Sequence, residues 1–131
     1  MKINRMFHFS MGHTLHDYVG KCANLHGHNY QLSVIVESDT LNDQGMVMDF
    51  GDMKDIVKPI IDKQYDHRFL VYQRDPRADT LKLLDPTVKI VQFNPTAEWL
   101  VLDIEERLLK AGLQRIAGLR LWETEDSYAE I

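Results

Sequence analysis

Two stretches of the chain alternate apolar and polar residues with the period of two that β-strands show. The first is KINRMFHFS at residues 2–10, although both of its faces include apolar residues. The second is HNYQLSVIVES at residues 28–38, where one face is apolar: Tyr30, Leu32, Val34 and Val36. We therefore expect a strand in each stretch, with Gly45 marking a turn after the second.

Two longer stretches repeat apolar residues at helical intervals. FGDMKDIVKPIIDK predicts a helix over residues 50–63, with Pro59 able to kink it or end it early. NPTAEWLVLDIEERLLKAG predicts a helix over residues 94–112, with Asn94 as the cap and Pro95 at the first helical position.

The remaining segments are shorter. VKIVQF at residues 88–93 predicts a short strand, and IAGLRLWE and SYAEI predict terminal strands at 116–123 and 127–131. The polar, proline-containing residues 73–86 indicate a loop. Two strands, a helix, a short strand, a helix and two strands together indicate an α+β fold with antiparallel pairing.

Composition narrows the class of protein. A chain of 131 residues with 44% hydrophobic and 27% charged residues is typical of one folded domain, here residues 1–131. A net charge of −5 without a basic cluster argues against a nucleic-acid partner and favours a small molecule. The single cysteine forms no internal disulfide, and no segment resembles a signal peptide or membrane span. We expect a cytoplasmic protein without a membrane partner.

The segment CANLHGHNY at residues 22–30 contains candidate chemistry. On a strand, His26 and His28 point to the same face with Cα atoms about 6.5 Å apart, so both imidazoles can bind one ion. An isolated pair of this kind is more often solvent-facing, and a catalytic zinc typically needs a third protein ligand. Four residues are candidates for it: His8, His13, His16 and Cys22. Of these, His13 would lie alongside His26 on a neighbouring strand.

Cys22 has two interpretations. It is either a fourth ligand that closes a structural site, or a base that faces an open metal. The neighbouring pair Asp66 and His67 can supply the charge that lowers a thiol pKa, although by itself this pair indicates only a polar turn. Glu123 ends a predicted strand, where a glutamate usually meets solvent.

Six motifs favour a functional interpretation of these residues. In chain order they are FSMGHTL, CANLHGHNY, GMVMDF, YDHRFL, NPTAEWL and WETEDSY. With them the chain resembles the 6-pyruvoyltetrahydropterin synthase / 6-carboxytetrahydropterin synthase (QueD) family over nearly its whole length. The resemblance implies the tunnelling fold (T-fold), an antiparallel four-stranded sheet with two helices on one face. It also implies that subunits form a β-barrel as trimers, that two trimers stack as a homohexamer, and that active sites lie between subunits.

The resemblance further implies a set of site residues. A Zn²⁺ ion would be bound by His13, His26 and His28. The implied catalytic residues are Cys22, Asp66, His67 and Glu123. Glu123 would bind the pterin edge, while Asp66 orients His67 and His67 acts with Cys22. Adjacent residues on a strand face opposite ways, so the Asp66–His67 pair requires an irregular backbone.

The implied reaction is that of a lyase. It converts 7,8-dihydroneopterin triphosphate to 6-carboxytetrahydropterin, acetaldehyde and triphosphate on the route to queuosine. The alternatives are 6-pyruvoyltetrahydropterin synthase, another dihydroneopterin enzyme such as an aldolase or epimerase, and a zinc-binding module without turnover. The chain departs from the family at Met11 and Gly12, where two alanines are usual, and in a longer segment at residues 74–91.

Candidates for contact with the phosphate groups of the substrate are Arg5, Lys21 and Arg77. Glu98 is left out of the core site, because the helix dipole alone favours an acidic residue in the first turn of a helix.

Overall fold

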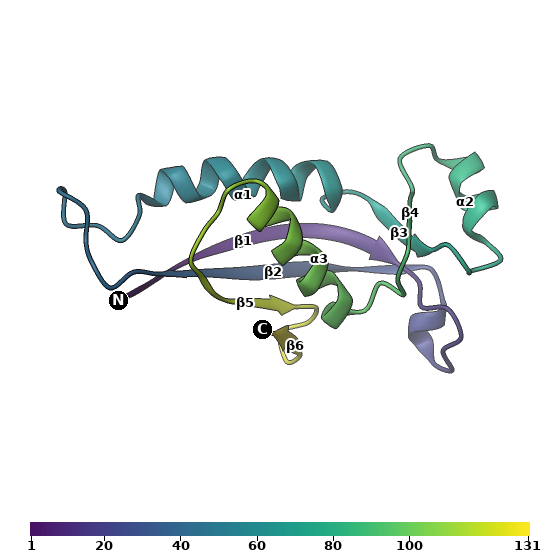
Figure 1. Ribbon diagram of the computed structural model, residues 1–131. Coiled ribbons are helices and arrows are strands. Elements are labelled where there is room, and N and C mark those ends of the chain that lie inside the picture. The colour runs from purple at the N-terminus through teal and green to yellow at the C-terminus, as the bar shows by residue number, and fades with distance from the viewer.

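A long antiparallel hairpin forms the centre of the computed structural model, which describes residues 1–131 (Figure 1). β1 (Lys2–His13) and β2 (His26–Glu37) pair along their whole length, from Lys2 opposite Glu37 to His13 opposite His26. Both predicted strands are confirmed and extend further toward the connection that joins them. Their alternation turns one apolar face toward the core, which includes Phe7, Phe9, Tyr30 and Leu32.

Two helices cover this apolar face: α1 (Phe50–Gln64) lies along the hairpin and α3 (Ala97–Lys110) crosses it. Both helices were predicted. Pro59 lies inside α1 without ending it, since buried residues on both sides of the proline pack into the core. The N-cap of α3 is Thr96 rather than the predicted Asn94, because the Thr96 hydroxyl accepts the amide hydrogen of Trp99.

The sheet has six strands rather than four, in the order β4-β3-β1-β2-β5-β6. β5 (Ile116–Trp122) and β6 (Tyr128–Glu130) continue it in antiparallel fashion, whereas β3 (Phe69–Tyr72) and β4 (Lys89–Val91) pair in parallel. The prediction of a purely antiparallel sheet is therefore wrong. β3 was missed because its four residues, FLVY, are a continuous apolar run too short to show a period.

The segment predicted as a loop at residues 73–86 contains a third helix, α2 (Ala78–Leu84). Ala78 and Leu81 pack with Val71 and Val88 in a small hydrophobic cluster of their own. The sequence does not reveal this helix because it is short, because Leu83 and Leu84 are exposed, and because proline and aspartate flank it.

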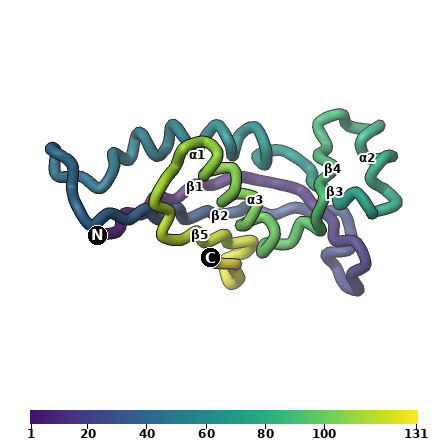
Figure 2. The backbone as a smooth tube through the Cα atoms, viewed as in Figure 1, coloured from purple at the N-terminus to yellow at the C-terminus, as the bar shows by residue number.

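The tube in Figure 2 shows α2, β3 and β4 at the end of the hairpin where the connection between β1 and β2 also lies. The helices and the sheet enclose one main core of twenty buried residues. None of the helices combines the length and the hydrophobicity that crossing a lipid bilayer demands.

Candidate metal centre and active site

Three histidines converge at the end of the hairpin where the connection joins β1 to β2. His13 is the last residue of β1 and lies directly opposite His26, the first residue of β2, as the sequence predicted. His28 follows two positions later on the same face as His26. One ring nitrogen from each histidine lies within 4.8 Å of the others, so the three could hold a metal ion.

Hydrogen bonds at the far side of two of these rings fix their orientation. The Nδ1 atom of His13 lies 2.7 Å from the Pro95 carbonyl oxygen, and Nδ1 of His26 lies 2.8 Å from the Asn24 carbonyl oxygen. A carbonyl only accepts, so each Nδ1 donates and each Nε2 presents a lone pair. Metal-binding histidines are commonly held in this way.

The lone pairs then need a cation. Nε2 of His13 and Nε2 of His26 are 3.1 Å apart, and two lone pairs cannot satisfy one another. Nε2 of His28 is buried without a hydrogen-bond partner. Ligands at about 2.0–2.1 Å in a tetrahedral site are themselves about 3.4 Å apart, so these nitrogens fit a zinc ion with small side-chain movements.

The surroundings of His13 and His28 also favour the neutral imidazole form that binds a metal. Burial lowers the pKa of His13 below its ordinary value, against the opposing effects of the Pro95 carbonyl and Glu123. Burial lowers the pKa of His28 in the same direction. Metal binding requires the neutral imidazole, and both shifts favour that form near neutral pH.

Glu123 lies immediately after β5, beside this histidine cluster. One carboxylate oxygen is 3.5 Å from Nε2 of His28, and the other is 4.0 Å from Nε2 of His13. The Tyr30 hydroxyl donates to Glu123 over 3.4 Å, and burial together with the charge of Glu123 raises the pKa of Tyr30 well above its ordinary range. Sequence reasoning placed Tyr30 only on the apolar face of its strand. Its position two residues after His28, on the same strand face, could have indicated a place in the site.

Asp66 and His67 form a second cluster in the turn after α1. Nδ1 of His67 lies 3.0 Å from a carboxylate oxygen of Asp66, which also accepts the Ser10 amide hydrogen. Burial acts in the opposite direction, but the bonds from Ser10 and His67 hold the pKa of Asp66 below its ordinary value. His67 has a φ of 54°, which confirms the irregular backbone expected for this pair.

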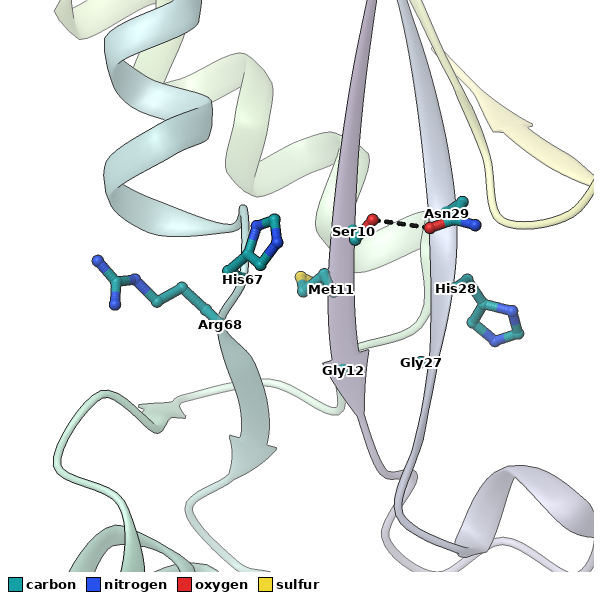
Figure 3. Close-up of a pocket in the computed structure, with 8 residues that line it drawn as sticks. All are labelled: Ser10, Met11, Gly12, Gly27, His28, Asn29, His67 and Arg68. Atoms are coloured by element: carbon teal, nitrogen blue, oxygen red, sulfur yellow. Dashed lines mark hydrogen bonds between the residues drawn. The ribbon is translucent and has the colours of Figure 1, made fainter.

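This second cluster lies beside the edge of β1 that faces away from β2, where the His67 amide donates to the Ser10 carbonyl oxygen. In Figure 3, His67 stands beside an open hollow next to Ser10, while the ring of His28 projects away from it. Gly27 lines this hollow, and no larger residue fits there, because a Cβ at this position would come 2.8 Å from the Met11 carbonyl oxygen. One chain therefore does not bring Asp66 and His67 to the histidine cluster.

Cys22 lies in a single 3₁₀ turn, Lys21–Ala23, within the connection between β1 and β2. It is half-buried, and no hydrogen bond joins its thiol to His67 within the chain. It does not belong to the group of ligand atoms that could hold the metal.

Other candidates are placed outside this group. His8 is exposed on the opposite face of β1, and His16 lies beyond the strand, where its main chain bonds to Asn94. Glu98 lies in the first turn of α3 and is exposed. Arg5 donates to the Phe50 carbonyl oxygen at the start of α1.

A comparison with family models identifies the family of the chain. The model of the family described as 6-pyruvoyl tetrahydropterin synthase matches residues 2–131. The chain belongs to this family. Membership covers all three helices and all six strands, and so includes both the histidine cluster and the Asp66–His67 turn.

Curated relatives in the family are similar over nearly their whole length. The chain is 39% identical to the 6-carboxy-5,6,7,8-tetrahydropterin synthase of Haemophilus influenzae, with 98% of this chain and 96% of the relative covered. It is 38% identical to the protein of the same name from Aquifex aeolicus, again with 98% and 96% covered.

Solved structures share the fold. An uncharacterized protein from Wolinella succinogenes superposes with a TM-score of 0.85 at 24% identity, covering 100% of this chain and 97% of that one. The 6-pyruvoyl tetrahydropterin synthase of Caenorhabditis elegans superposes with a TM-score of 0.77 at 23% identity, covering 100% and 94%. The expected T-fold class is therefore confirmed, although the number of strands differs.

Proposed function

We propose that this chain is a zinc-dependent 6-carboxy-5,6,7,8-tetrahydropterin synthase. The substrate would be 7,8-dihydroneopterin triphosphate, and the products 6-carboxytetrahydropterin, acetaldehyde and triphosphate. The observation that supports this most is the convergence of three imidazole nitrogens beside the carboxylate of Glu123. The names of the most similar curated relatives favour the 6-carboxy product.

His13, His26 and His28 would hold the zinc ion. Three histidines leave a coordination position open, as catalytic zinc sites do. When bound there, zinc supplies Lewis acidity that polarises the hydroxyl groups of the substrate side chain. The Pro95 and Asn24 carbonyls keep the rings of His13 and His26 in the ligand tautomer.

Glu123 would bind the pterin ring. The ring edge presents an exocyclic amino group beside a ring N–H, and a carboxylate can accept both hydrogens at once. The Tyr30 hydroxyl already donates to Glu123 and so restrains the carboxylate. Because Glu123 lies within 4.0 Å of two of the histidines, a ring bound there would place its side chain next to the metal centre.

Cys22 would move the protons, with His67 and Asp66 tuning it. Within one chain the Asp66–His67 pair lies beside the edge of β1 that faces away from β2, and His67 is largely exposed. We therefore propose that this pair serves a Cys22 thiol of a neighbouring subunit, in the homohexamer of two trimers that the family resemblance implies. Light scattering tests the assembly, since a monomer would leave the pair without a thiol.

The 6-pyruvoyl branch of the family is the second candidate. The family model is described by that activity, and the fold is shared with a worm enzyme of that name. The two products differ in the number of side-chain carbons. Nothing in the positions of the histidine cluster separates the branches, so the product has to be measured.

The deciding experiment is mass spectrometry of the product from 7,8-dihydroneopterin triphosphate with the zinc-loaded protein. We expect 6-carboxytetrahydropterin together with acetaldehyde. A product that retains the pyruvoyl side chain would move the protein to the second candidate. Recovery of unchanged or merely dephosphorylated substrate would refute both synthase functions.

A further inference from the structure

The segment between β3 and β4 touches the turn that contains Cys22. Sequence reasoning left the role of residues 74–91 open, and the structure places them beside the connection between β1 and β2 (Figures 1 and 2). Arg77, the residue just before α2, makes the contact. The two segments are more than fifty residues apart in sequence.

A buried carboxylate first fixes the Arg77 side chain. The Nε and Nη2 atoms of Arg77 lie 2.9 Å and 2.7 Å from the two carboxylate oxygens of Asp75, a forked ion pair. Asp75 is only 3% exposed, and the bonds from Arg77 lower its carboxyl pKa below the ordinary value. A planar guanidinium held on two edges has little freedom left.

The other edge of the guanidinium is bound to the Cys22 connection. Nη2 donates to the Thr14 hydroxyl over 2.8 Å, and Nη1 donates to the Ala23 carbonyl oxygen over 3.0 Å. The fully buried Thr14 hydroxyl itself donates to the same Ala23 carbonyl over 2.9 Å. Thr14 directly follows the metal ligand His13, and Ala23 directly follows Cys22.

These contacts occupy most of the donors that Arg77 has. Four hydrogen bonds use four of its five N–H groups, on Asp75, Thr14 and Ala23. A phosphate-binding arginine needs its fork free for phosphate oxygens. The structure thus disfavours the phosphate role considered for Arg77 and indicates that it supports the turn.

We propose that Arg77, held by Asp75, is a positioning residue that fixes the Cys22 turn relative to the metal centre. The inference rests on the proposed function only in taking Cys22 as the proton-transferring group. A single 3₁₀ turn has little rigidity of its own. Without Arg77, two hydrogen bonds would tie it to the residues that follow β1: the Leu15 amide donates to the Cys22 carbonyl oxygen, and the Thr14 hydroxyl donates to the Ala23 carbonyl oxygen. Misplacing a reacting group by about 1 Å can reduce a rate by about 100-fold.

The test compares Arg77→Lys and Arg77→Ala with Arg107→Ala as a matched control. Arg107 also pairs with an aspartate, Asp103, and its side chain is 38% exposed against 43% for Arg77, but it lies on α3. Arg77→Lys keeps a cation beside Asp75 and so preserves the fold even if Arg77→Ala does not. Both Arg77 variants should lose kcat by roughly 10- to 100-fold while KM changes less than about threefold. Zinc content should stay unchanged.

Two further measurements separate positioning from general destabilisation. Guanidinium chloride at low millimolar concentration should restore part of kcat in Arg77→Ala and none in Arg107→Ala. Hydrogen exchange should accelerate by roughly tenfold or more in residues 14–24 of the Arg77 variants, including the Leu15 amide, with α3 unchanged.

Unchanged exchange in residues 14–24 of a folded Arg77 variant would overturn the inference, and so would faster exchange with normal kcat. If the wild-type protein makes no pterin product, the proposed function fails on its own. The exchange measurement would then still decide whether Arg77 holds the turn.

Discussion

Removing Cys22 or His28 distinguishes a catalytic thiol from a metal ligand. Cys22→Ala should leave about one zinc per subunit, because the group of atoms that could hold the metal consists of three histidine ring nitrogens and does not contain the Cys22 thiol. Its turnover should fall by roughly two to four orders of magnitude, the usual range for a lost acid–base group. His28→Ala should lose both zinc and activity.

The size of the zinc effect follows from the number of ligands. A four-ligand structural site binds zinc with roughly 10–16 kcal/mol, or about 3 kcal/mol per ligand, so losing one of three histidines should weaken binding by more than about 100-fold. His8→Ala is the matched control, since His8 lies on β1 but is exposed on the opposite face. It should retain full zinc content.

The assay is metal analysis by atomic emission after dialysis against a mild chelator, with turnover measured on the same samples. If Cys22→Ala loses as much zinc as His28→Ala, Cys22 is a fourth ligand and the site is closed. That result would remove the coordination position on which the proposed reaction depends.

Three other substitutions test separate parts of the structure. Glu123→Gln replaces an acceptor by a donor, so pterin binding measured by calorimetry should weaken by about 1.5–3 kcal/mol with zinc retained; unaltered binding would contradict the anchor, and lost zinc would make Glu123 a ligand. Tyr65→Phe removes a 2.6 Å hydrogen bond to a carboxylate of α3 and should lower the free energy of unfolding in urea by about 1–3 kcal/mol. The lowered pKa of Asp75 means that its ion pair stabilises the fold above about pH 4, the value for an unfolded chain, and that this is lost as pH falls through the lower folded pKa. Between pH 5 and pH 3, the free energy of unfolding should therefore change less in Asp75→Asn than in the wild-type protein. An equal change in both proteins would contradict the assignment.

Local patterns in the sequence were sufficient for the long elements and for two of the three histidines of the metal centre. The alternation in β1 and β2 and the helical spacing in α1 and α3 are set by neighbouring residues, so they can be recognised without knowing the rest of the fold. The pair His26 and His28 is of this kind, because residues two apart on a strand share a face. The family motifs then indicated His13 and Glu123.

Only the tertiary structure decided which distant residues meet. Hairpin register places His13 opposite His26, and the end of β5 brings Glu123 to the same face, whereas His67 lies beside the edge of β1 that faces away from β2. β3 and α2 are too short to be recognised by their own periodicity and are held by packing against β1 and β4. The support of Cys22 by Arg77 depends on two segments that have no local relation in the sequence. Long-range pairing of this kind is determined by the packing of the whole sheet, and no window of neighbouring residues contains it.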